Sequence, residues 1–100
     1  MQAQLLGEVL AEANDDDVVW IEGNAYFPPS SLRTGVLELS TRAYTCPWKG
    51  AARYFHIRTN AELTEDAAWS YPHPVPSAIR RVRTDFSNYI AFAAPLVGVR

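Results

Sequence analysis

The chain has 100 residues, of which 48% are hydrophobic and 20% are charged, and its formal net charge is −2. This length is typical of one folding unit, so we expect a single domain over residues 1–100. The slight acidic excess argues against nucleic acid as a partner, because nucleic-acid binders carry a basic surface. No stretch approaches the roughly 20 apolar residues that cross a membrane, so we expect no membrane partner either.

The cysteine count limits the kinds of site that are possible. Cys46 is the only cysteine, which excludes an internal disulfide and any multi-cysteine metal site. A single cysteine fits a reducing compartment. Residues 1–10 contain no basic side chain, unlike a secretory signal. We therefore predict a cytoplasmic protein, with neither a metal nor another cofactor.

The N-terminal segment is predicted as a strand followed by a polar turn. Residues 3–13 favour a strand bent at Gly7, and a helix is the alternative, with Gly7 in its middle and no cap before it. Residues 14–17 contain three consecutive acids. They lack the spacing, glycine and closing glutamate of a calcium loop, so a solvated turn is predicted there.

The next segment carries the clearest strand signal of the chain. Residues 18–22 are β-branched and aromatic, and residues 23–24 tolerate positive φ. The chain is extended again at residues 25–27, so a tight hairpin is predicted. Residues 30–33 are predicted as a single helical turn, and residues 36–39 as a weak strand.

The central segment is predicted as a turn followed by a strand. Pro47 removes a backbone donor, which places residues 46–47 at a turn or a strand edge. Gly50 allows a close approach of the backbone. Residues 51–58 alternate, so a strand is predicted. One face would present Ala51, Arg53, Phe55 and Ile57, and the other Ala52, Tyr54, His56 and Arg58.

The C-terminal segment is predicted as loops, a short helix and a closing strand. Residues 60–66 are polar and turn-like, and residues 67–76 carry three closely spaced prolines, which predict an ordered loop and not a central strand. Ser77 is predicted to cap a short helix over residues 78–83. Residues 89–93 are predicted as a closing strand. The signals together predict a mainly β fold with one or two short helices.

Four segments, spread over nearly the whole chain, carry a resemblance to a known family. They comprise residues 19–24 with 26–29, residues 45–52 with Tyr54, residues 67–72 with Pro74, and residues 89–92. The most specific part is Cys-Pro-Trp-Lys-Gly followed later by Ala-Ala-Trp-Ser-Tyr-Pro. On these motifs the chain resembles the DUF427 family of small bacterial domains.

The resemblance implies a compact Mss4-like (β-tent) domain, in which sheets lean together around a pocket. Relatives of that architecture hold a structural zinc through paired CxxC motifs, and with one cysteine no structural zinc is expected here. The family is also labelled nucleotidyltransferase-like. The sequence lacks a Gly-Ser followed by an Asp-x-Asp pair, which that chemistry would use to hold two magnesium ions.

Cys46 has two interpretations. It is a nucleophile or redox thiol if Lys49 or free backbone donors at the turn activate it. It is a small buried apolar group if it behaves as most free cysteines do. A catalytic thiol would need a base, and neither His56 nor His73, the only histidines, lies at a recognisable spacing from it.

Lys49 is the only lysine, since the other eight basic residues are arginines. An ammonium group in this position can bind an anion, act as an amine if desolvated, or simply cover Trp48. Glu22 is either a buried acid that faces Lys49 or a residue on the exposed side of a hairpin. For His56 a structural role is favoured over ligand contact.

The aromatic residues exceed what a small core needs, and rings with polar handles often line concave sites. We predict a small-ligand-binding domain, with a pocket between the Cys46–Lys49 turn and the Trp69–Tyr71 loop, for an anionic or aromatic small molecule. Two alternatives are a thiol-dependent enzyme with Cys46 as nucleophile, and a protein-interaction module that uses residues 69–76. The residues indicate where a binding site lies, but they do not identify a reaction. The predicted ligand contacts are Glu22, Tyr26, Trp48, Lys49, Tyr54, His56, Trp69 and Tyr71.

Overall fold

The computed structural model describes residues 1–100 as nine strands in three sheets, with one α-helix before the eighth strand. In chain order, the strands are β1 (Gln2–Leu5), β2 (Glu8–Glu12), β3 (Val19–Ile21), β4 (Asn24–Tyr26), β5 (Leu37–Cys46), β6 (Gly50–Arg58), β7 (Leu63–Ser70), β8 (Ala91–Phe92) and β9 (Gly98–Val99). The sheets have the orders β2-β1-β9, β3-β4 and β5-β6-β7-β8, and every pairing is antiparallel.

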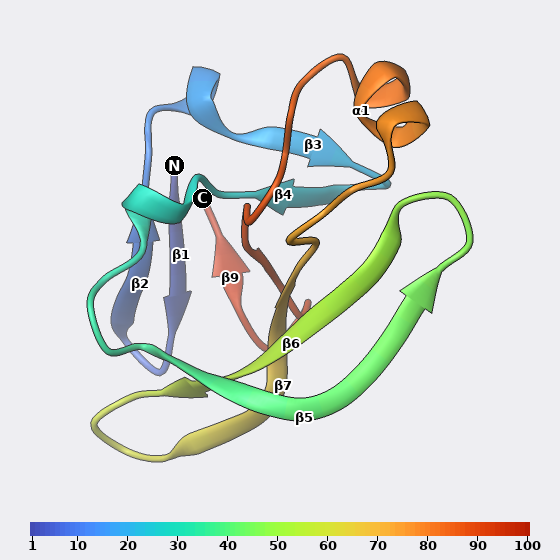
Figure 1. The fold of residues 1–100 in the computed structure, drawn as a ribbon. Helices are drawn as coiled ribbons and strands as arrows, with labels where there is room; N and C mark the ends of the chain where they lie inside the picture. Colours follow the sequence, from blue (N-terminus) through green and yellow to red (C-terminus); the bar gives the residue numbers. More distant parts are fainter.

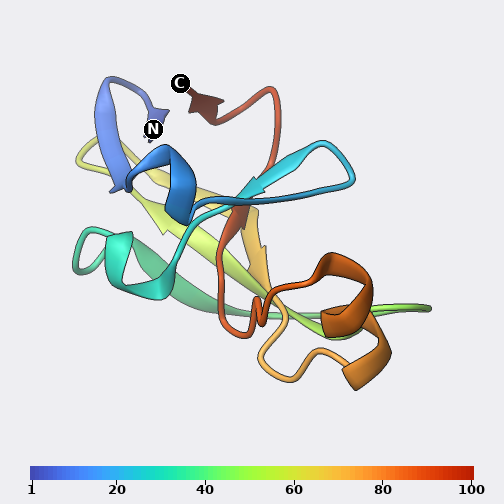
Figure 2. The same ribbon diagram turned by 90° about the horizontal axis from the view of Figure 1, so that it is seen from above.

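The sheets enclose two hydrophobic clusters. The larger cluster contains 14 buried residues, among them Leu10, Phe27, Ile57 and Phe92, and it lies where all three sheets meet. The smaller cluster of 7 residues joins the β3–β4 hairpin to α1 (Pro76–Val82) and the tip of the β5–β6 hairpin. That tip and α1 lie at the same end of the molecule in Figures 1 and 2. The predicted mainly β fold is confirmed, and the open sheets fit the Mss4-like description.

The N-terminal segment forms a hairpin, so the prediction of one bent strand was wrong. Leu6 and Gly7 have φ values of 51° and 78°, and they form the turn between β1 and β2. Two consecutive residues with positive φ reverse the chain and do not merely bend it. The β3–β4 hairpin was predicted correctly, but its turn residues are Glu22 and Gly23, one position earlier than expected.

The strands of the four-stranded sheet are longer than the sequence predicts. β5 runs on to Cys46, well beyond the predicted residues 36–39. β7 occupies much of the predicted turn over 60–66 and the first part of the predicted loop over 67–76, and it lies between β6 and β8. The three prolines do not prevent this strand, because the first of them, Pro72, comes after β7 has ended.

The helix begins earlier than predicted. Pro76 occupies its first turn, where the missing N–H costs nothing, and the capping residue is Val75, so Ser77 is not the cap. Arg83 ends the helix with a left-handed φ of 67°. The closing strand β8 has only two residues, and Ile90 adds an isolated bridge to Phe27. Among the helices, none has the length and apolar character needed to cross a membrane.

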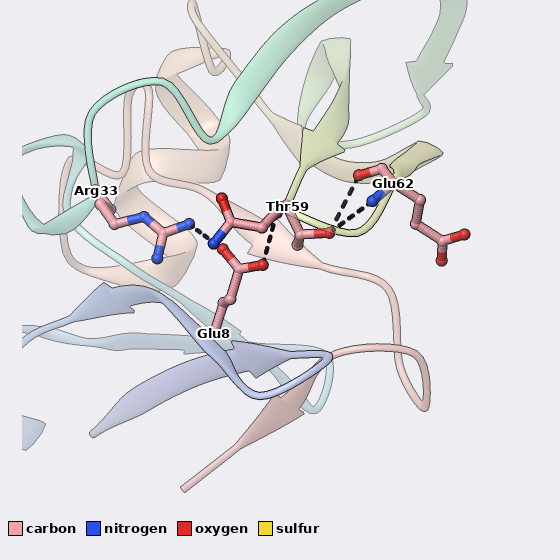
Figure 3. Close-up of polar contacts among 5 residues, drawn as sticks. Glu8, Arg33, Thr59 and Glu62 are labelled. Atoms are coloured by element: carbon pink, nitrogen blue, oxygen red, sulfur yellow. Dashed lines mark hydrogen bonds and ion pairs between the residues drawn. The ribbon is translucent and has the colours of Figure 1, made fainter.

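A polar contact ties the first hairpin to two distant turns, as Figure 3 shows. Glu8 accepts a hydrogen bond of 2.8 Å from Arg33 and another of 2.7 Å from the backbone N–H of Asn60. The bond from Arg33 holds the pKa of Glu8 below its usual value. Thr59 and Glu62 close the turn after β6 with two further bonds. The contact fixes the end of the molecule opposite α1.

Candidate functional site

A hollow of about 500 Å³ lies between the β3–β4 hairpin, the tip of the β5–β6 hairpin and the end of β7. It differs in character from two larger surface hollows. Seven of its 12 lining residues are hydrophobic, against two of ten near Asp15–Asp17 and one of eight near Arg33. The lining residues are Glu22, Asn24, Tyr26, Arg42, Tyr44, Cys46, Pro47, Trp48, Lys49, Tyr54, Trp69 and Tyr71.

The structure brings most of the predicted site residues to this one hollow. The Cys46–Lys49 turn and the Trp69–Tyr71 segment line it together, although 19 residues separate them in the chain. His56 is the one predicted contact that does not line it. The predicted contacts that do line it are Glu22, Tyr26, Trp48, Lys49, Tyr54, Trp69 and Tyr71, together with the candidate thiol Cys46.

The tip of the β5–β6 hairpin is held by the segment before α1. Cys46 pairs with Gly50, and the three residues between them form the turn. Gly50 has a φ of 113°, which disfavours any residue with a side chain, and an added Cβ would meet the backbone oxygen of His73 at 3.4 Å. The backbone oxygen of Lys49 accepts a hydrogen bond of 3.0 Å from Val75. The turn is therefore fixed from outside the hollow.

Lys49 and Glu22 form an ion pair on the wall of the hollow. The Lys49 ammonium donates a hydrogen bond to the Glu22 carboxylate, and it lies 5.0 Å from the Trp48 ring centroid and 5.1 Å from that of Tyr71. Lys49 is only 5% exposed, whereas the Glu22 side chain is 56% exposed. Glu22 is therefore not the buried acid of the first alternative: it lies exposed at the turn of the hairpin, and from there its carboxylate contacts Lys49.

The pair keeps both side chains charged. Burial alone would lower the pKa of Lys49, but the hydrogen bond from its ammonium to Glu22 and the negative charge of that carboxylate raise the pKa above its usual value. The same hydrogen bond lowers the pKa of Glu22. A lysine with a raised pKa is protonated at neutral pH, so this geometry disfavours the interpretation of Lys49 as a reactive amine.

The aromatic wall is organised by contacts between its own rings. The Trp69 indole N–H donates a hydrogen bond of 3.1 Å to the hydroxyl of Tyr26. Tyr26 stacks with Tyr71 at 6.5 Å between ring centroids, and Tyr54 lies 6.1 Å from Trp69. Burial raises the pKa values of Tyr26 and Tyr71, so both hydroxyls remain protonated at neutral pH. The rings are therefore positioned in the absence of any ligand.

Four lining residues were missed by the sequence analysis: Asn24, Arg42, Tyr44 and Pro47. Arg42 is the most informative of them, because its guanidinium carbon lies 4.4 Å from the centroid of the Tyr54 ring. The period-2 signal was present in the sequence. If the predicted strand over 36–39 had been continued to Cys46, Tyr44 and Cys46 would have shared one face.

His56 lies with a polar group on the strands, outside the lining. Its Nδ1 accepts a hydrogen bond of 3.1 Å from the backbone N–H of Asp66, and Asp66 in turn accepts one from Ser40. Ser40 lies where the register of the β5–β6 pairing shifts, and His56 lies where the register of the β6–β7 pairing shifts. His56 thus contacts the protein's own backbone and not the hollow, and a structural role for it stays a prediction.

Cys46 lines the hollow from within the smaller hydrophobic cluster and is 7% exposed. No histidine lines the hollow, and His73 is exposed on the segment before α1. A thiolate nucleophile would therefore lack the adjacent base that such chemistry commonly uses. No group of three or more His, Cys, Asp or Glu side chains is placed to hold a metal ion.

A family model described as a domain of unknown function (DUF427) matches residues 1–99. No curated protein has a similar sequence. The match covers every element of the fold, including all 12 residues of the hollow.

Proposed function

The chain belongs to the DUF427 family, and because that description assigns no activity, we propose its function from geometry: the hollow binds a small, planar ligand against its aromatic wall. The proposal concerns binding and includes no reaction. Ligand sites are typically concave, with apolar walls and a few polar groups that fix orientation. The volume of about 500 Å³ lies in the usual range for such sites.

The observation that carries the proposal is the gathering of aromatic side chains around one open space. Six rings line it: Tyr26, Tyr44, Trp48, Tyr54, Trp69 and Tyr71. Rings bury a large apolar area at low entropic cost, and planar ligands stack on them in offset or edge-to-face arrangements. Two of them, Tyr26 and Tyr71, also belong to the smaller hydrophobic cluster, and the other four are at least partly exposed. This arrangement supports binding of a ring-containing ligand.

The ion pair supplies the polar part of the site. Lys49 donates its hydrogen bond to one oxygen of the Glu22 carboxylate. The free lone pairs of this carboxylate can accept a hydrogen bond from a ligand. Neither alternative from the sequence has a specific observation in its favour. Cys46 has no histidine beside it at the hollow. In the proposed interaction segment, Trp69 and Tyr71 line the hollow and Pro74 is buried, so these residues form no outward patch.

The test is a thermal-shift series with indole and benzamide as ring-containing probes. The wild-type protein should gain stability with increasing concentration of a probe that it binds. Trp48→Leu should reduce that gain, whereas Trp20→Leu should leave it unchanged, because Trp20 is 58% exposed and lies outside the lining. Equal loss in both variants, or no gain in the wild type at millimolar probe, would count against the proposal.

A further inference from the structure

One of the three charged side chains that line the hollow has no partner. Glu22 and Lys49 pair with each other, whereas Arg42 forms no ion pair, and its guanidinium donates no hydrogen bond within the protein. The lining thus carries one uncompensated positive charge in a chain whose formal net charge is −2. Arg81 lies 4.4 Å over the Trp48 ring and adds positive charge nearby. A positive site of this kind attracts an anion.

The position of Arg42 suits a ligand that joins an anion to a ring. Its guanidinium lies over the Tyr54 ring, and that ring contacts Trp69. A guanidinium in this arrangement keeps its edge donors free, and those donors match the two oxygens of a carboxylate. A carboxylate bound there would direct the group attached to it along the wall of Tyr54 and Trp69.

The backbone at Arg42 is already held in place. The N–H of Arg42 donates a hydrogen bond of 3.0 Å to the Ser40 hydroxyl, within the irregular segment between Leu39 and Ala43. Ser40 donates in turn to Asp66, which is the residue that contacts His56. The segment that carries Arg42 therefore need not be ordered when a ligand binds, and this reduces the entropic cost of binding.

Lys49, the lysine singled out in the sequence, is less accessible to an anion than Arg42. Its ammonium is buried and already paired with Glu22 beside two rings. An anion could contact it only by displacing a carboxylate that belongs to the protein. At Arg42 an anion displaces only water.

Resting on the proposed function, we propose that the hollow takes a planar aromatic acid. The carboxylate of this ligand pairs with Arg42, its ring lies against Tyr54 and Trp69, and the pair between Glu22 and Lys49 stays intact. Arg42 is thus the residue that selects acids over neutral compounds of the same shape.

The test compares benzoate with benzamide, which have nearly the same shape and differ in charge. Dissociation constants are measured on the full chain by tryptophan fluorescence at low salt. Wild type should bind benzoate about tenfold more tightly than benzamide, as expected for one charge-assisted contact. Arg42→Gln should abolish that preference, so that benzoate and benzamide bind with similar dissociation constants. Arg42→Lys should retain part of it.

The matched control is Arg53→Gln, since Arg53 is an exposed arginine on β6 that does not line the hollow. This variant should keep the tenfold preference, which should also shrink as salt is added. If Arg42→Gln keeps the preference for benzoate, the inference about Arg42 is overturned while ligand binding stands. If wild type binds neither probe at millimolar concentration, the proposed function itself fails.

Discussion

The indole nitrogen of Trp69 donates a hydrogen bond of 3.1 Å to the hydroxyl of Tyr26, and this contact joins the end of β7 to β4 in the lining of the hollow. The two residues are 43 positions apart in the chain. Tyr26 is 1% exposed, so the bond is shielded from water and fixes two walls of the site relative to each other.

Removal of this bond should destabilise the fold. Tyr26→Phe leaves the Trp69 N–H without its partner and should cost about 1 to 2 kcal/mol of unfolding free energy. Trp69→Phe should cost a similar amount, and the double variant less than the sum of the two, because both remove one shared contact. Urea denaturation measures all three. Tyr89→Phe is the control, because the Tyr89 hydroxyl forms no hydrogen bond within the protein. Strictly additive costs would show that the bond contributes nothing.

The two members of the Glu22–Lys49 pair should differ in their effect on stability. Glu22→Gln leaves a buried ammonium without its countercharge and should cost about 1 to 2 kcal/mol. Lys49→Met replaces the ammonium by an apolar chain of similar length, and leaves a carboxylate that solvent can hydrate, so its cost should be smaller. Chemical denaturation at neutral pH measures both.

The exposed pair of Glu38 and Arg58 provides a matched comparison for this experiment. Glu38→Gln should cost clearly less than Glu22→Gln, because both partners of the Glu38–Arg58 pair are well exposed and solvent screens their attraction. A larger cost for Lys49→Met than for Glu22→Gln would contradict the expectation that an unpaired buried ammonium destabilises the fold more than an unpaired exposed carboxylate.

The contribution of Glu22 should vanish in acid. Its pKa is lowered in the folded protein from the ordinary value of 4.5. A lowered pKa contributes stability that is fully present above the unfolded value and is lost as the pH falls through the folded value. The difference in melting temperature between wild type and Glu22→Gln should therefore be constant from neutral pH to about pH 5, and should shrink below that.

This difference isolates Glu22 from the other acids with lowered pKa values. Glu8, Glu38 and Asp85 are shifted in the same direction, but they are present in both proteins and cancel. A difference that instead grew on acidification would mean that Glu22 is better stabilised in its protonated form, against the geometry of the pair.

Cys46 should react slowly with alkylating agents. It is buried in the smaller hydrophobic cluster, and reaction requires local opening of the turn at Pro47. Iodoacetamide at neutral pH should modify the native protein at least about 100-fold more slowly than the protein in concentrated urea. Mass spectrometry follows the reaction. Rapid modification of the native protein would revive the hypothesis of a reactive thiol.

The sequence predicted the strands whose signal is local. The β3–β4 hairpin has β-branched and aromatic residues on either side of a turn, and β6 alternates over most of its length. β7 was missed because its first half, Leu63–Asp66, looks polar in isolation. Pairing with β6 and β8 stabilises an extended chain there in spite of local propensity.

The lining residues of the site could be predicted better from their residue types than from the predicted secondary structure. Trp48, Lys49 and Trp69 were singled out because aromatic and lone basic residues stand out in composition, and they do lie around one hollow. Arg42 could not be singled out in this way, since it is one of eight arginines. Its placement depends on the irregular segment of β5 and on Ser40, which only the three-dimensional structure reveals.

The most direct test of ligand binding at this hollow uses the three tryptophans as reporters. The chain has three tryptophans, so a ¹⁵N-labelled sample gives three indole N–H signals in a two-dimensional NMR spectrum. Trp48 and Trp69 line the hollow, and Trp20 does not. Single Trp→Phe variants assign the signals.

Titration with benzoate should move the Trp48 and Trp69 signals along one saturating curve and leave the Trp20 signal in place. If the Trp48 and Trp69 signals stay fixed at high millimolar benzoate and benzamide, or if only the Trp20 signal moves, the hollow is not the binding site that we propose.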